Sequence, residues 1–119
     1  MRDKGTAYED VALFHLERQG LHLVERNYRT KCGEIDLIMR QDETLVFVEV
    51  RYRAPNRYGT GLDSIDRHKR RKIVRAAQHY LQRTRLDRRM TCRFDVVAVD
   101  GQSPEDLTWL PRAFTADDI

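Results

Sequence analysis

Two acidic residues stand inside apolar runs that have the length and composition of neighbouring β-strands, and this feature constrains the fold most. Asp36 lies in the run at 33–40 and Glu49 in the run at 44–53, with a short polar turn at 41–43 between them. Asp and Glu are depleted in strands, and burying a charge without a partner is costly. Each acid therefore needs a compensating partner, and the two candidates are a divalent metal ion and a basic side chain.

The hydrophobic pattern of the chain predicts one α/β domain spanning residues 1–119. We expect a helix from Thr6 to Gly20, strands at 21–28, 33–40, 44–53 and 92–99, a loop at 54–63, a helix at 64–83 and a short last element at 107–110. The second and third strands form a hairpin, and the long helix is a right-handed crossover to a parallel fourth strand. The predicted core is a mixed sheet flanked by helices, in the order αβββαβ.

The composition is that of a globular domain with one modest core, because 40% of the 119 residues are apolar and 34% are charged. No apolar run approaches the ~20 residues of a membrane-spanning helix, and the first residues lack the apolar segment of a signal peptide. We therefore expect a cytoplasmic protein. Cys32 and Cys92 fit no zinc-binding spacing, and in that compartment two reduced cysteines are favoured over a single disulfide.

Charge is distributed unevenly along the chain. Residues 51–93 carry 14 Lys or Arg against 3 acids, whereas the remaining residues carry 8 basic and 16 acidic side chains. A segregated positive region favours a polyanionic partner, here DNA, over a helix face that is simply solvated. The candidate DNA contacts are basic residues that precede the long helix or lie on it: Arg53, Arg57, Lys69, Arg70, Lys72 and Arg75.

The two strand acids suit phosphodiester hydrolysis, which requires a nucleophilic water, neutralisation of the phosphate and a stabilised leaving oxygen. A divalent ion can serve all of these needs. Asp36 and Glu49, helped by the backbone carbonyl of Val50, are the candidate ligands for Mg²⁺ or Mn²⁺, which prefer oxygen. Arg51 follows Glu49 at i+2 and shares its side of the strand, which would place it beside the attacking water or the scissile phosphate. The pattern predicts a metal-dependent nuclease centre.

Each of these acids also has a purely structural interpretation. Asp36 and Glu49 can form a buried salt-bridge cluster with the arginines that follow on the second of the two strands. Glu9 is either the partner of Thr6 in a capping box at the start of the first helix or a third acid that reaches the metal or an ordered water. Asp95 is expected to be an ion-pair partner near the end of the sheet, outside the catalytic set.

Four sequence motifs together carry a resemblance to a known family. They are Gly-Glu-Ile-Asp-Leu-Ile at 33–38, Val-Phe-Val-Glu-Val at 46–50, Lys-Arg-Arg-Lys at 69–72 and Arg-Phe-Asp-Val at 93–96. The combination, which covers nearly the whole chain, resembles the YraN-type endonucleases. That family is similar to Holliday junction resolvases and to the restriction-endonuclease-like PD-(D/E)XK fold. The resemblance implies that Glu9 is the acid of the first helix, Asp36 the strand acid and Glu49 the acid of the E-x-K element, and that the protein acts on branched DNA as a homodimer.

The sequence departs from the family pattern at Arg51, where the pattern has lysine. Arginine is always charged and cannot act as a base, although its planar guanidinium can hold a phosphate. Two functions therefore compete: a metal-dependent DNA endonuclease, and a nucleic-acid-binding protein that keeps the nuclease fold with weak or lost catalysis. A scaffold whose basic face binds an acidic protein is a third alternative.

Overall fold

The computed structural model describes residues 4–53, 65–86, 90–100 and 106–116. Within this part of the chain two helices and five strands follow one another as α1 (Lys4–Arg18), β1 (His22–Arg29), β2 (Glu34–Gln41), β3 (Thr44–Arg53), α2 (Arg67–Thr84), β4 (Thr91–Asp100) and β5 (Leu107–Phe114). The predicted order of helices and strands is confirmed, and the short last element is a full strand. The loop expected at 54–63 lies outside the described residues.

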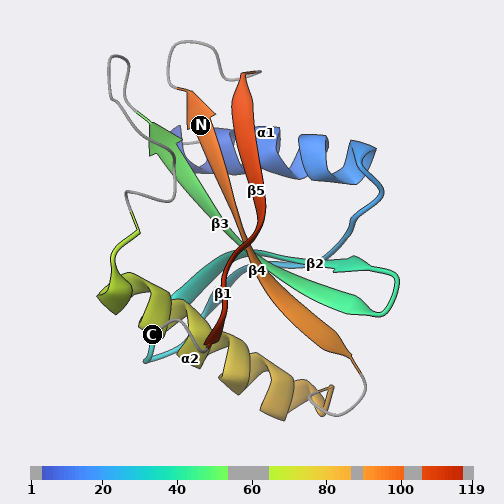
Figure 1. Cartoon of the computed structure of the whole chain (residues 1–119), viewed down its shortest axis with the longest axis vertical. Helices are drawn as coiled ribbons and strands as arrows, with labels where there is room; N and C mark the ends of the chain where they lie inside the picture. Colours follow the sequence, from blue (N-terminus) through green and yellow to red (C-terminus); the bar gives the residue numbers. More distant parts are fainter. Residues whose placement is uncertain (1–3, 54–64, 87–89, 101–105, 117–119) are drawn as a thin grey trace.

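The five strands form one mixed sheet in the order β1-β2-β3-β4-β5. β3 and β4 are parallel, whereas the other neighbouring strands are antiparallel. Figure 1 shows the twisted sheet running between α1 and α2. The α/β class with a mixed sheet, expected from the apolar pattern, is therefore confirmed. Among the described residues no helix is long and apolar enough to cross a membrane.

Each face of the sheet has its own hydrophobic core, because successive side chains of a strand point to opposite faces. Phe47 of β3 packs with buried residues of α2 such as Ile73 and Tyr80. Val46 and Val48 of the same strand instead join the cluster that contains buried residues of α1. A strand covered on both faces requires a nearly continuous apolar run, which is why the acid in β3 stood out in the sequence.

The start of α1 differs from the prediction. Among the described residues the helix already includes Lys4, so Thr6 lies inside it and cannot be the N-cap, which stands at the helix boundary. The predicted capping box is wrong for this reason. The predicted end is confirmed: Gly20 has a φ of 95°, and the N–H of Leu21 donates to the carbonyl of Leu16 at 3.1 Å. This is the glycine-terminated helix end that the sequence indicated.

The beginning of α2 is defined by a cap that the sequence analysis did not identify. Asp66 has an extended backbone, and its Oδ1 accepts a hydrogen bond from the N–H of Lys69 at 2.8 Å. The β1–β2 turn packs closely against the same end of the helix, because a Cβ on Gly33 would lie 2.6 Å from the Lys72 carbonyl oxygen. The first turns of α2 are thereby fixed against the beginning of β2.

Candidate functional site

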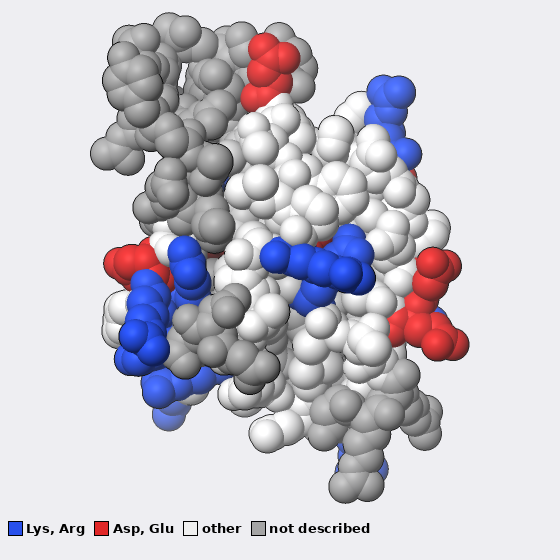
Figure 2. All heavy atoms as spheres, in the orientation of Figure 1, with Lys and Arg blue, Asp and Glu red and all other residues white. Residues whose placement is uncertain are grey.

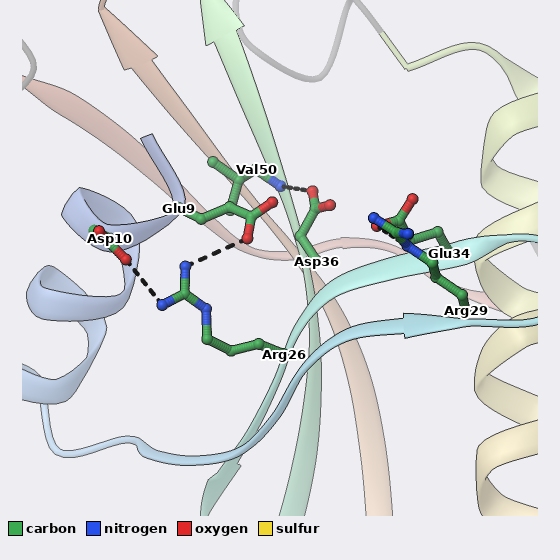
Figure 3. Close-up of polar contacts among 7 residues, drawn as sticks. All are labelled: Glu9, Asp10, Arg26, Arg29, Glu34, Asp36 and Val50. Carbon is green, nitrogen blue, oxygen red and sulfur yellow. Dashed lines mark hydrogen bonds and ion pairs between the residues drawn. The ribbon is translucent and has the colours of Figure 1, made fainter. Parts of the chain in front are cut away.

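The candidate site lies where β2 and β3 stop pairing. Their backbone ladder runs from Gln41 and Thr44 at the turn to Leu37 and Val48. Asp36 is the next residue of β2 beyond the last paired residue, Leu37. Its side chain continues the contact between the two strands, because its Oδ2 accepts a hydrogen bond from the N–H of Val50 at 2.8 Å (Figure 3). A carboxylate thus replaces a backbone partner and is held in a fixed position at the open end of the strand pair.

Asp36 and Glu49 line the same pocket, which has a volume of about 360 Å³. The other lining residues come from the β1–β2 turn, the start of β2 and the first turns of α2: Gly33, Glu34, Asp66, His68, Lys69, Lys72 and Ile73. The structure therefore brings together the two strand acids, and it adds a helix that the sequence analysis had assigned to DNA binding alone.

The two acids make this pocket electrostatically demanding. Burial, and after it the negative charge of nearby Glu49, together raise the pKa of Asp36 to about 8, although the hydrogen bond from Val50 N–H opposes both effects. Two carboxylates in a poorly solvated site repel each other strongly, so a positive charge between them is favoured. This is the environment in which a divalent cation would bind.

Glu49 is only 5% exposed and is paired with two cations from different elements. Lys69 Nζ of α2 lies 3.0 Å from Glu49 Oε1, and Arg51 Nη1 of β3 lies 3.5 Å from the same oxygen. The sequence predicted the neighbouring arginine but not the lysine. The only signal for Lys69 is its place three residues after Asp66, which marks it as the N3 position of a capped helix.

Glu9 of α1 faces the sheet close to this site. Figure 3 shows its carboxylate between the guanidinium of Arg26 and the carboxylate of Asp36. Arg26 Nη2 lies 3.4 Å from Glu9 Oε1, and Asn27, with its amide nitrogen turned toward the acid, donates to the same oxygen at 3.2 Å. Burial raises the pKa of Glu9, and its charge in turn contributes to the raised pKa of Asp36. The position of Thr6 excludes the capping-box role of Glu9, and its role as a third acid of the site stays a prediction.

The candidate DNA-binding residues are placed differently from one another. Lys72 lines the pocket, and Arg75 is exposed one turn further along α2. Arg70 is directed inward: its Nε donates to the Ile65 carbonyl at 3.0 Å, and its guanidinium lies over the Phe114 ring. The side chain of Arg53 and the whole of Arg57 lie outside the described residues. Figure 2 shows Lys and Arg side chains gathered over the N-terminal end of α2, at the lower left of the view.

Asp95 has the structural role that the sequence indicated. It is fully buried, and its carboxylate accepts from Arg93 Nε at 3.1 Å, from Trp109 Nε1 at 2.9 Å and from Arg112 N–H at 3.0 Å. It thus joins β4 to β5. Cys32 and Cys92 are both free, as expected.

The donor set at the pocket matches what a small hard cation requires. Within the described part of the chain no group of three or more His, Cys, Asp or Glu side chains is placed to hold a metal. Mg²⁺, however, usually uses one or two protein carboxylates and keeps several waters. Asp36 and Glu49 would supply two carboxylates of this kind, with the backbone of Val50 beside them.

Comparison with known proteins identifies the family. Residues 8–99 match the model of the uncharacterised protein family UPF0102. The UPF0102 protein of Alkalilimnicola ehrlichii is 53% identical over 114 residues, covering 96% of this chain and 88% of that protein. The corresponding protein of Nitrosococcus oceani is 48% identical, covering 95% and 92%, and that of Legionella pneumophila is 46% identical, covering 97% of both. The matched region includes the acids of α1, β2 and β3 and the start of α2, and the chain belongs to the UPF0102 family.

Proposed function

We propose that this protein is a Mg²⁺- or Mn²⁺-dependent DNA endonuclease that hydrolyses phosphodiester bonds in branched DNA. The observation that carries the proposal is the pair Asp36 and Glu49, a half-buried and a buried carboxylate that line one pocket beside a basic helix. The hydrogen bond to Val50 and the ion pairs of Glu49 compensate each acid only in part, because the charge of Glu49 still raises the pKa of Asp36.

The charge of α2 supports a polyanionic substrate. The basic residues in the N-terminal half of the helix are Arg67, Lys69, Arg70, Arg71, Lys72 and Arg75, whereas the nearest acid of that segment is the cap residue Asp66. The N-terminus of a helix carries a partial positive charge, so cations there are unfavourable unless anions compensate them. Lys69 is paired with Glu49, and Arg70 is directed inward. A phosphate backbone running past the pocket would compensate the exposed cations that remain.

Each charged residue around the pocket would have its own role in hydrolysis. Asp36 and Glu49 would hold the divalent ion, which when bound lowers the pKa of a water and neutralises charge on the phosphate. Glu9, held by Arg26 and Asn27, can accept a hydrogen bond from a water beside Asp36. Arg51 keeps a permanent positive charge beside Glu49 and can bind a phosphate oxygen.

Cleavage assays with matched variants test this proposal. We expect the wild-type protein with Mg²⁺ or Mn²⁺ to cut a four-way junction or a flap faster than a linear duplex. Asp36→Asn and Glu49→Gln should abolish cleavage, whereas Arg18→Met, an exposed cation at the far end of α1, should cleave normally. Cleavage that persists in both acid variants would come from a contaminating nuclease or another site, and would contradict the assignment.

A DNA-binding protein without catalysis is the second candidate, and the observation that favours it is arginine at position 51 in place of lysine. Both candidates require the basic surface of α2. Phosphate contacts release counterions, so affinity should fall steeply with salt. The double variant Lys72→Ala, Arg75→Ala should bind DNA more weakly, with a flatter dependence of log affinity on log salt. Salt-independent binding would contradict both candidates, and binding without cleavage would support the second.

A further inference from the structure

Lys69 occupies a position in the pocket that is different from that of a surface DNA contact. Its ammonium lies 3.0 Å from Glu49 Oε1, closer than the 3.5 Å from Arg51 Nη1 to the same oxygen. The side chain of Glu49 is 6% exposed and that of Lys69 is 42% exposed. The ammonium of Lys69 therefore meets a buried acid, although much of the side chain is in contact with solvent.

The backbone that carries Lys69 is held independently of its side chain. Asp66 Oδ1 accepts a hydrogen bond from the Lys69 N–H at 2.8 Å, and Arg70 Nε donates to the Ile65 carbonyl at 3.0 Å. Ile73, one turn further along, is buried in the core beneath the helix. A change in the side chain of Lys69 should therefore leave the start of α2 in place, which makes the residue accessible to a clean test.

We propose that Lys69 is a catalytic residue of the centre and that its ammonium contacts the phosphodiester group during cleavage. This rests on the proposed nuclease function. In the reaction a water oxygen bonds to phosphorus, the bond from phosphorus to the leaving oxygen breaks, the proton of the water passes to solvent, and the leaving oxygen takes a proton from solvent. Lys69 stays protonated throughout and donates a hydrogen bond to a phosphate oxygen as negative charge builds up there.

Lys69 of α2 places an ammonium beside Glu49, and Arg51 of β3 places a guanidinium beside the same acid. A compact ammonium on a flexible stem can turn from Glu49 to a phosphate that enters the pocket, whereas the planar guanidinium has a fixed geometry. The competing interpretation is that Lys69 only neutralises Glu49. The two differ in their consequences: a neutralising cation matters for folding, while a catalytic one matters for the rate.

Single-turnover cleavage by Lys69→Met, with the protein in excess at a concentration that saturates the DNA and with Arg18→Met as the charge-matched control, distinguishes the two roles. We expect the rate of the Lys69 variant to fall by roughly a hundredfold or more, as when one transition-state donor is removed, while DNA affinity falls by less than about tenfold. The control should cleave at the wild-type rate. A wild-type rate for Lys69→Met would overturn the proposal and leave the proposed function intact.

Chemical rescue excludes a folding effect. Lys69→Cys, made in a background with Cys32→Ser and Cys92→Ser because both native cysteines are exposed, can be alkylated with bromoethylamine to restore an ammonium at nearly the original position. We expect alkylation to restore most of the lost cleavage. The alkylated variant and the unalkylated background should also unfold at the same urea concentration. If they do and alkylation restores no cleavage, the catalytic role of Lys69 is wrong.

A readout independent of cleavage completes the test. In lysine-labelled protein without metal, adding a short DNA duplex should shift the side-chain resonance of Lys69, because the DNA would draw its ammonium away from Glu49. An unmoved Lys69 resonance at saturating DNA would overturn the proposed contact. If the resonance shifts but the wild-type protein never cleaves, the proposed function itself fails, and Lys69 is a DNA contact without catalytic role.

Discussion

Asp36→Asn tests the electrostatic account of the pocket most directly. Burial and the charge of Glu49 raise the pKa of Asp36 from 3.8 to about 8. A carboxyl whose pKa is raised on folding stabilises the protein below its unfolded pKa, and this contribution is lost as the pH rises toward the folded value. Between pH 4 and pH 8 the wild-type protein should therefore lose stability progressively, because Asp36 ionises in the unfolded chain while it stays protonated in the fold. The amide of the variant does not titrate and can still accept the hydrogen bond from Val50.

The size of the effect follows from the shift in pKa. At about 1.4 kcal/mol per pKa unit, a rise from 3.8 to about 8 corresponds to roughly 6 kcal/mol, an upper limit because the pocket can relax and admit water. We expect Asp36→Asn to be more stable than the wild-type protein by about 2–4 kcal/mol at pH 8.5 and to differ little at pH 4. With a urea slope of about 1–2 kcal/mol per molar, the midpoint at pH 8.5 should rise by at least 1 M.

Urea denaturation at pH 4, 6 and 8.5, followed by circular dichroism, measures this difference. Glu43→Gln is the matched control, because its side chain is exposed in the β2–β3 turn, at the end of the strand pair away from the pocket. Mg²⁺ at pH 8.5 should stabilise the wild-type protein and not Asp36→Asn, since only the former has both carboxylates. If Asp36→Asn is less stable than the wild-type protein at pH 8.5, Asp36 is already compensated within the fold, and the argument for a bound cation fails.

Three substitutions test the surrounding structure by urea denaturation. Gly33→Ala should destabilise the fold by about 1–3 kcal/mol, because its Cβ would lie 2.6 Å from the Lys72 carbonyl oxygen; an unchanged midpoint would show that the turn can move away. Asp95→Ala should cost about 3–5 kcal/mol, since it leaves the Arg93 side chain, which is only 15% exposed, without its carboxylate; a cost below 1 kcal/mol would contradict this role. Tyr28→Phe should cost about 1 kcal/mol through the lost hydrogen bond to His79 Nδ1, and a stabilised variant would refute it.

The sequence predicted those parts of the fold in which the hydrophobic pattern of a segment matches the element that the segment forms. Apolar runs and the glycine after α1 located the strands and the end of that helix. The capping box failed because a Thr-x-x-Glu pattern fits any helical turn, and only the actual start of the helix decides whether Thr6 is a cap. The last strand was underestimated because Pro111 interrupts its pattern. A proline is tolerated at the edge of a sheet, where β5 lies, since its missing N–H needs no ladder partner.

Some residues of the candidate site could likewise be identified from the sequence, and one could not. Asp36 and Glu49 could be singled out because an acid in an apolar strand is anomalous on its own, without knowledge of its neighbours. Lys69 could not, because it is one of several basic residues in succession, and its contact joins α2 to β3 across twenty residues of chain. Which member of a basic run faces the sheet depends on where the helix begins. That is set by the Asp66 cap and by the close packing of Gly33, which are details of tertiary structure.

The ion pair between Lys69 and Glu49 has a consequence for how substrate and metal binding interact. A phosphate that draws the ammonium of Lys69 toward itself weakens the pairing of a buried carboxylate, and this carboxylate then favours another cation more strongly. DNA should therefore tighten metal binding, and by thermodynamic reciprocity metal should tighten DNA binding by the same factor. The coupling should be smaller in Lys69→Met, where Glu49 has lost this partner before DNA arrives. A centre arranged in this way binds its metal most tightly when a phosphate backbone already lies along α2, so that metal and substrate are bound together.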